Sequence, residues 1–84
     1  MITIDPQKYN LSKRIKLQEG PDGIFIIINR KSRVVMKDAK RISEAVRKIK
    51  NIDPKKRVGV LSTAPICSKT KTFLFNKNIS IKNI

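Results

Sequence analysis

Acidic residues are scarce in this sequence. Six Asp and Glu stand against 20 Lys and Arg in 84 residues, which gives a formal net charge of +14 at pH 7. A domain this small repels itself at such a charge, and the surplus is typical of proteins that meet a polyanion. A thermophilic composition would enrich Lys and Glu together, yet Glu occurs only as Glu19 and Glu44. The shortage of acids therefore indicates a partner that supplies negative charge.

Histidine is absent, and cysteine occurs once, as Cys67. A single cysteine cannot form an internal disulfide, and the chain lacks the Cys and His set of a structural zinc site. The commonest general base is missing as well. We therefore expect no metal and no cofactor, assign no catalytic residue, and favour a protein that is not an enzyme.

Long apolar segments are missing too. No apolar stretch approaches 18 residues, and the N-terminus does not resemble a signal peptide. These absences predict a soluble, cytoplasmic protein without membrane contact. Eighty-four residues are enough for one modest hydrophobic core, so we expect residues 1–84 to form a single small basic domain.

Alternating apolar and polar residues predict strands at the start of the chain. A short strand is expected within residues 1–10 and a second within 13–17, before a strong turn signal at 18–23. Residues 23–29 are almost continuously apolar, as in a strand buried on both faces. We expect them to form a hairpin with a short strand at 33–36.

Helical periodicity marks two later segments. Apolar residues at three- and four-residue spacing predict an amphipathic helix over 38–50, with Asp38 as its N-cap. A short helix is predicted over 69–77, capped by Ser68. Strands are expected at 57–61 and from Ile79 onward. Phe25 and Phe73 are assigned to the hydrophobic core.

These elements predict an α/β fold that borders on α+β. We expect a small mixed β-sheet of five or six strands, with N-terminal β-strands and a hairpin followed by β-α-β-α-β. Right-handed crossovers are favoured for both parallel connections. So few residues would leave one sheet face poorly covered, which suggests a homodimer or a protein partner on that face.

Basic residues are densest between Arg30 and Arg57, where twelve bases stand against Asp38, Glu44 and Asp53. Too few acids are present to pair them, so this region is predicted to grip a phosphate backbone, with Lys13, Arg14 and Lys16 as an extension. Such binding weakens steeply with salt, because each neutralised phosphate releases a counterion. The predicted nucleic-acid contacts are Arg30, Lys31, Arg33, Lys37, Lys40, Arg41, Arg47, Lys48, Lys55, Lys56 and Arg57.

A second candidate site lies where a buried strand leads into the short helix. A helix N-terminus offers free N–H groups to an anion, and Cys67 close to it could ionise readily. The segment 65–69 resembles the active-site turn of the glutaredoxin and thioredoxin family, with Thr70 in place of the second cysteine of that family. The candidate anion-binding residues are Thr63, Cys67, Ser68 and Lys69.

A third pattern covers more of the chain. Pro21-Asp22, a gap of twelve residues and then Val35-Met36-Lys37 is similar to the motif spacing of the restriction-endonuclease-like nucleases, which include archaeal Holliday-junction resolvases. The resemblance implies a metal ligand at Asp22 and a catalytic lysine at Lys37. Val35 occupies the position of the second acidic ligand, so it implies an inactive relative that binds nucleic acid. Without this resemblance, Asp22 is interpreted simply as the Asp of an Asp-Gly turn.

Three functions remain open from the sequence. The leading interpretation is a non-enzymatic nucleic-acid-binding protein: chromatin-like, ribosome-associated or an accessory subunit. The second is a thiol or anion-binding, enzyme-like protein that uses the Cys67 turn. The third is a basic interaction subunit that docks on an acidic protein. The choice between DNA and RNA, and between single and double strands, stays open.

Overall fold

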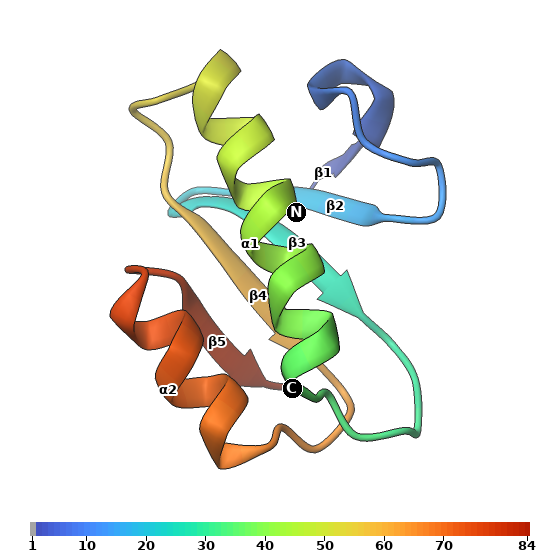
Figure 1. Cartoon of the computed structure of the whole chain (residues 1–84). Coiled ribbons are helices and arrows are strands. Elements are labelled where there is room, and N and C mark those ends of the chain that lie inside the picture. The colour runs from blue at the N-terminus through green and yellow to red at the C-terminus, as the bar shows by residue number, and fades with distance from the viewer. Residues whose placement is uncertain (1) are drawn as a thin grey trace.

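A five-stranded mixed sheet carries two helices on one of its faces (Figure 1). The computed structural model describes residues 2–84. The elements in chain order are β1 (Ile2–Ile4), the 3-10 helix η1 (Pro6–Tyr9), β2 (Lys16–Gly20), β3 (Gly23–Ile28), α1 (Met36–Ile52), β4 (Val58–Ser62), α2 (Ser68–Asn76) and β5 (Ser80–Asn83). The fold is therefore a small α/β domain of β-β-β-α-β-α-β order.

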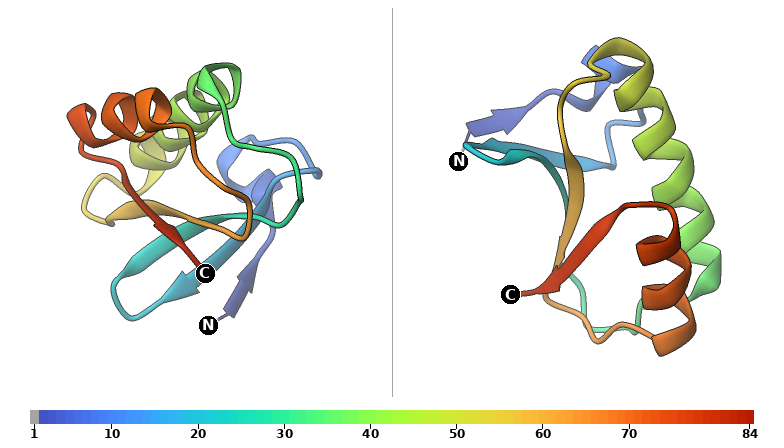
Figure 2. Two further views of the ribbon diagram at one scale, coloured as in Figure 1. Left: turned by 90° about the horizontal axis from the view of Figure 1, so that it is seen from below. Right: turned by 90° about the vertical axis from the view of Figure 1, so that its left-hand side faces the viewer.

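Strands follow one another across the sheet in the order β1-β2-β3-β4-β5. The first two pairings are antiparallel, and β3-β4 and β4-β5 are parallel. Each parallel connection contains a helix. Because both crossovers progress in the same direction and right-handed connections are strongly favoured, α1 and α2 lie on the same face. Figure 2 shows both helices on that face and none on the other.

Strand alternation separates a covered face from an open one. Register partners share a face of the sheet, and one such row runs through Leu17, Ile26 and Val60. These residues are almost fully buried beneath the helices, together with Ile24 and Val58. The hydrophobic core therefore occupies only the space between the sheet and the two helices.

Tyr9 anchors the N-terminal segment to the end of α1. Its side chain is fully buried, and its hydroxyl donates a hydrogen bond to Asp53 Oδ2 at 2.5 Å. Burial, followed by this bond to a carboxylate, raises the pKa of Tyr9 to about 12. Asn10 adopts a left-handed conformation, with φ 60°, and ends η1. The contact thus joins residues that are far apart in the sequence.

The structure confirms the fold class and corrects several details. The expected hairpin of 23–29 with 33–36 is wrong, because β2 and β4 already occupy both edges of β3. The hairpin is instead β2-β3, closed at Gly20 and Gly23. Of residues 33–36, Val34 forms one isolated bridge with Ile66, and Met36 begins α1. The second strand also starts later than expected and runs to Gly20.

The expectation that residues 23–29 are buried on both faces is wrong as well. Phe25 and Ile27 point to the open face and stay partly exposed. Phe25 therefore does not belong to the core, whereas Phe73 packs against it. The reason is topological, since both helices return on one side. The first expected strand began at Met1, which lies outside the described residues.

Helix boundaries differ by a few residues from the expected ones. Helix α1 has Val35 as its N-cap, so Asp38 lies three residues inside. Its carboxylate nevertheless accepts a hydrogen bond from the Val35 backbone N–H at 2.9 Å. Cys67, not Ser68, is the N-cap of α2. Within residues 2–84, neither helix combines the length and the hydropathy that crossing a bilayer requires.

Candidate nucleic-acid interface

Helix α1 directs its basic side chains away from the sheet. Its buried positions repeat at three- and four-residue spacing, so the positions between them face outward. Seventeen residues make this helix about 25 Å long. We call this outward row the basic stripe; it consists of Lys37, Lys40, Arg41, Arg47 and Lys48, with Glu44 as its one acid.

Arg30 stabilises the loop that leads into α1. Its Nε donates to the Ser32 carbonyl and its Nη2 to the Arg33 carbonyl, both at 3.2 Å. Nη2 also forms an ion pair with Asp38 Oδ2 at 2.5 Å. The hydrogen bond from Arg30 holds the pKa of Asp38 below its usual value. Arg30 therefore makes several hydrogen bonds within the protein, although its side chain is 38% exposed, and Lys31 and Arg33 are exposed beside it.

Acids gather around the other end of α1, where Lys55, Lys56 and Arg57 lie. Lys56 forms an ion pair with Glu19, and this hydrogen bond raises the pKa of Lys56. The same three bases line a hollow of about 540 Å³ together with Glu19 and Asp22. The positive charge of this cluster is thus partly neutralised by the protein itself.

Few of the predicted contacts have an internal counter-charge. Within residues 2–84 the ion pairs are Arg30–Asp38, Arg47–Glu44 and Lys56–Glu19. The Arg47–Glu44 pair is well exposed, so it adds little to stability. The predicted contacts that form no ion pair there are Lys31, Arg33, Lys37, Lys40, Arg41, Lys48, Lys55 and Arg57.

Arg14 adds to this surface along the flank of α1. It lines a hollow of about 260 Å³ together with Arg30, Arg41 and Asp38. Of these three arginines, Arg30 forms an ion pair with Asp38, and the charges of Arg30 and Arg41 both help to lower the pKa of Asp38. Lys48 lies on the same helix, and its Nζ donates to the Asn10 carbonyl at 3.4 Å. The first loop and α1 thus form one side of the molecule.

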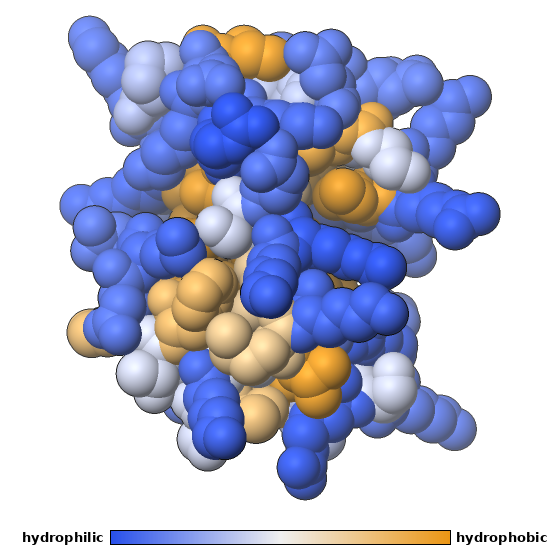
Figure 3. Space-filling model, in the orientation of Figure 1, coloured by the Kyte–Doolittle hydropathy of each residue, from blue (hydrophilic) through white to orange (hydrophobic). Residues whose placement is uncertain are grey.

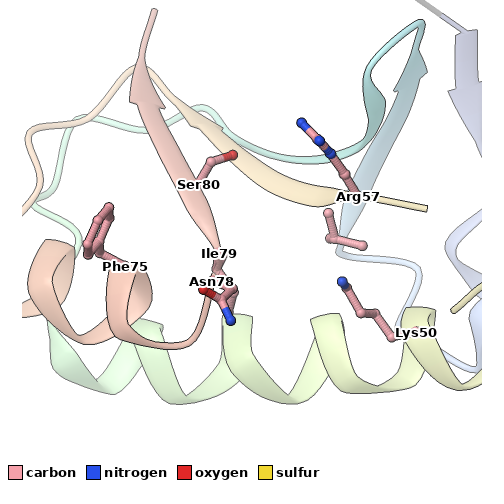
Figure 4. A pocket seen from close by; sticks show the side chains of 7 residues that line it. Lys50, Arg57, Phe75, Asn78, Ile79 and Ser80 are labelled. Atoms are coloured by element: carbon pink, nitrogen blue, oxygen red, sulfur yellow. The ribbon is translucent and has the colours of Figure 1, made fainter. Parts of the chain in front are cut away.

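Sequence reasoning missed a further hollow at the edge where β4 and β5 begin. It measures about 500 Å³ and contains no acid. Figure 4 shows Lys50 and Arg57 on one side of it, with Phe75, Asn78 and Ser80 on the other. No sequence pattern links the end of α1 to the α2-β5 turn, and only the fold brings these side chains together.

Basic residues also lie outside the eleven predicted nucleic-acid contacts, among them Lys16 of the predicted extension and Lys69 of the candidate anion site. Lys69, Lys71 and Lys77 belong to α2 or its end, whereas Lys16 and Lys82 are on the sheet. Figure 3 shows hydrophilic side chains over most of the helix-bearing face, with an apolar area between α1 and α2. A groove lined in part by Met36 and Phe73 lies there. Cationic side chains therefore occur on more than one face.

The Cys67 turn lies between β4 and α2 and is packed against the β3-α1 loop. The Cys67 N–H donates to the Val34 carbonyl at 3.0 Å. The backbone N–H groups of Thr70 and Lys69 lower the pKa of the partly exposed thiol. The Thr63 hydroxyl is instead within hydrogen-bond distance of Asn29 Oδ1, at 3.2 Å. Cys67, Ser68 and Lys69 are thus together at the start of α2, while Thr63, directly after β4, directs its hydroxyl to the residues that follow β3.

The residues implied by the nuclease resemblance lie far apart. Asp22 is in the turn that precedes β3, whereas Lys37 follows β3 in the first turn of α1. The six residues of β3 span about 20 Å between those two places. The motif spacing therefore does not assemble a metal site from Asp22 and Lys37.

Comparison with known proteins adds one similarity of fold. No family model matches the chain, and no curated protein matches it. Among solved structures, the apo form of EndoMS superposes with a TM-score of 0.65 at 14% sequence identity. The match covers 82% of this chain and 33% of EndoMS, so the chain spans about a third of that protein's length. At this identity the similarity is one of fold alone.

Proposed function

We propose that this protein binds nucleic acid by gripping the phosphate backbone with the basic stripe of α1 and the exposed bases at its N-terminal end. The observation that carries the proposal is that most bases there form no ion pair in the described part of the chain, because Asp38 is paired with Arg30 and Glu44 with Arg47. Lys31, Arg33, Lys37, Lys40 and Arg41 form no ion pair within residues 2–84. Bound phosphates would supply the missing negative charge.

Two further features support this surface over the rest of the molecule. The helix N-terminus contributes a positive dipole end close to Lys37. The opposite end of α1 is less suitable, because Glu19 and Asp22 lie near Lys55–Arg57. A backbone grip needs no base-specific contact, so the proposal predicts weak sequence preference and a strong dependence on salt.

The likeness to EndoMS offers independent but weaker support. By its name EndoMS is an endonuclease, and a shared fold is compatible with a DNA-related role for this chain. The chain corresponds to only part of EndoMS, and Asp22 and Lys37 lie apart. We therefore propose binding and not cleavage.

Charge reversal on one helix, matched by the same change on the other, tests the proposal. The test variant carries Lys37→Glu and Lys40→Glu in the first turns of α1. The control carries Lys69→Glu and Lys71→Glu in the first turns of α2, with the same total charge. All four side chains are exposed, so both variants should fold.

Fluorescence anisotropy with a labelled 20-base-pair duplex, titrated over a range of salt concentrations, measures the outcome. We expect the α1 variant to lose affinity at least tenfold, with the slope of log K against log salt reduced by about 2. The loss should be similar for unrelated sequences. If the α2 variant loses as much affinity as the α1 variant, the grip is not on α1 and the proposal fails.

A further inference from the structure

The open face of the sheet displays two ordered rows of side chains. Strand register places Gln18, Phe25, Gly59 and Ser80 in one row across β2 to β5. The neighbouring row contains Lys16, Ile27, Leu61 and Lys82. The apolar members, Phe25, Ile27 and Leu61, are partly exposed and make no part of the core cluster. The centre of this face is therefore apolar and uncovered.

Gly59 determines how the Phe25 ring lies on this face. A Cβ added at Gly59 would stand 3.3 Å from Cδ1 and Cε1 of Phe25. The ring therefore occupies the space above the Gly59 backbone and leans across β4. An aromatic ring held against a sheet in this way leaves its other side free for stacking.

Lysines stand at both ends of the apolar row. Lys16 on β2 and Lys82 on β5 are exposed and are separated by three strand spacings, about 14 Å. Neither row contains an acid. A hollow of about 300 Å³ beside Ile27 is lined in part by Lys13, Lys16 and Gln18. Cations and amide groups thus surround the apolar centre.

We propose that the open face is a stacking platform for the unpaired bases of a single-stranded nucleic acid, with Phe25 as its aromatic contact and Lys16 and Lys82 as its phosphate contacts. The proposal rests on the proposed function, and it adds a second surface to the basic stripe. Sheets that present aromatics beside cations bind single strands by this combination. Duplex bases are already stacked, so the platform discriminates against paired substrates.

Charge decides against a second copy of this chain as the occupant. Two copies would bring Lys16 and Lys82 of each close to the lysines of the other, and each chain has a net charge of +14. A polyanion with flat apolar rings satisfies both the lysines and the apolar centre.

A matched pair of leucine substitutions tests the platform on the full chain. Phe25→Leu keeps the apolar bulk and removes the ring, whereas Phe75→Leu makes the same change on α2, where the side chain is 76% exposed. The probes are labelled oligo(dT) of twenty nucleotides and a duplex of twenty base pairs. We expect Phe25→Leu to weaken oligo(dT) binding roughly tenfold and duplex binding less than twofold. Phe75→Leu should change neither. Equal effects of the two variants on oligo(dT) would overturn the proposal.

Tryptophan substitution supplies a second readout that does not depend on affinity. The chain has no tryptophan, so Phe25→Trp introduces a unique fluorophore on the open face. Stacking of thymine on the indole should quench its emission on titration with oligo(dT), and Phe75→Trp should show no such quenching. Emission of Phe25→Trp that is unchanged at saturating oligo(dT) contradicts the platform, even if Phe25→Leu proves unstable.

These outcomes separate the platform from the basic stripe. If charge reversal at Lys37 and Lys40 abolishes duplex binding while the Phe25 variants show no change with oligo(dT), the proposed function stands and the platform fails. If oligo(dT) quenches the emission of Phe25→Trp but charge reversal on α1 has no effect, the platform stands and the proposed role of the basic stripe fails. Sedimentation that shows a stable dimer, dispersed by Leu61→Lys, assigns the open face to protein association and also overturns the platform.

Discussion

The two faces of the sheet use the same strands for different purposes. On the covered face, Leu17, Ile26 and Val60 pack against the helices and are buried. The basic side chains on this side of the molecule lie on the outer surface of α1. On the open face, the side chains of the strands themselves meet solvent, with Phe25 and Leu61 between two lysines. Cations held by a helix above a packed core suit phosphates alone, whereas cations beside exposed apolar groups suit phosphates and bases together. The net charge of the chain therefore does not reveal that its two sides differ chemically.

Adjacent isoleucines in β3 provide the strongest test of this contrast. Ile26 is 5% exposed beneath the helices, and Ile27 is on the open face. Ile26→Ala should lower the free energy of unfolding by about 2–5 kcal/mol, and Ile27→Ala by less than about 1.5 kcal/mol. Urea denaturation measures both. Equal losses would mean that something covers the open face, and repeating the Ile27→Ala measurement at two protein concentrations would reveal an oligomer.

Two glycines give a smaller and more local contrast. Gly23 has φ 137°, and an added Cβ would lie 2.2 Å from the Arg57 carbonyl oxygen. The nearest obstacle at Gly59 is the Ser80 Oγ at 2.4 Å, which rotation of the side chain can remove. Gly23→Ala should therefore cost on the order of 1–3 kcal/mol.

For Gly59→Ala we expect a loss of about 1 kcal/mol, together with displacement of the Phe25 ring. Thermal unfolding ranks the two variants, and oligo(dT) anisotropy follows the ring. A Gly59→Ala protein that binds oligo(dT) with unchanged affinity would show that the position of the ring is unimportant.

The ion pair between Asp38 and Arg30 on the helix-bearing side predicts that stability depends on pH. The pKa of Asp38 lies below its ordinary value of 3.8, so its ion pair with Arg30 stabilises the fold above about pH 4. This contribution disappears as the pH falls through the lowered pKa. Asp38→Asn should cost about 1 kcal/mol at pH 6, and the difference from the wild type should shrink below pH 4. Thermal unfolding at several pH values measures it. A difference that is independent of pH would assign the loss to something other than the charge of Asp38.

Cys67 yields the smallest expected effect. Backbone N–H groups lower the pKa of this partly exposed thiol, so the folded protein should react with iodoacetamide below the pH that an ordinary cysteine requires. Cys67 is not one of the proposed contacts, although Arg33 lies close enough to help lower its pKa, so alkylated protein should still bind duplex and oligo(dT). Reaction followed by mass spectrometry and anisotropy checks both statements. Impaired binding after alkylation would place the α2 N-terminus within the interface.

Most of the fold was accessible from the sequence, because local patterns decide it. The stripe of Ala39, Ile42 and Ile49 gives α1, and a short segment with Leu74 inward gives α2. The predicted connection after β3 was wrong, because the apolar residues 34–36 resemble a strand whether or not a sheet edge is free to pair with them. No local sequence pattern indicates that β2 and β4 already pair with the two edges of β3.

The candidate sites were less accessible, because they depend on which face each strand turns to solvent. Residues 24–28 show no alternation, so burial on both sides was the natural interpretation. Only the shared direction of both crossovers leaves Phe25 uncovered. Likewise, local charge density predicts Arg30 as a contact, but it does not reveal the hydrogen bonds that Arg30 makes to Ser32, Arg33 and Asp38.

The hydrogen bond between Tyr9 and Asp53 can be followed by the absorbance of the tyrosine itself. Tyr9 is the only tyrosine of a chain without tryptophan, so the ionisation spectrum of tyrosine reports a single contact between the N-terminal turn and the end of α1. Deprotonation of the phenol is expected near pH 12 while that contact holds, and near pH 10 once it opens. An alkaline spectral titration therefore follows the docking of the first ten residues without any label.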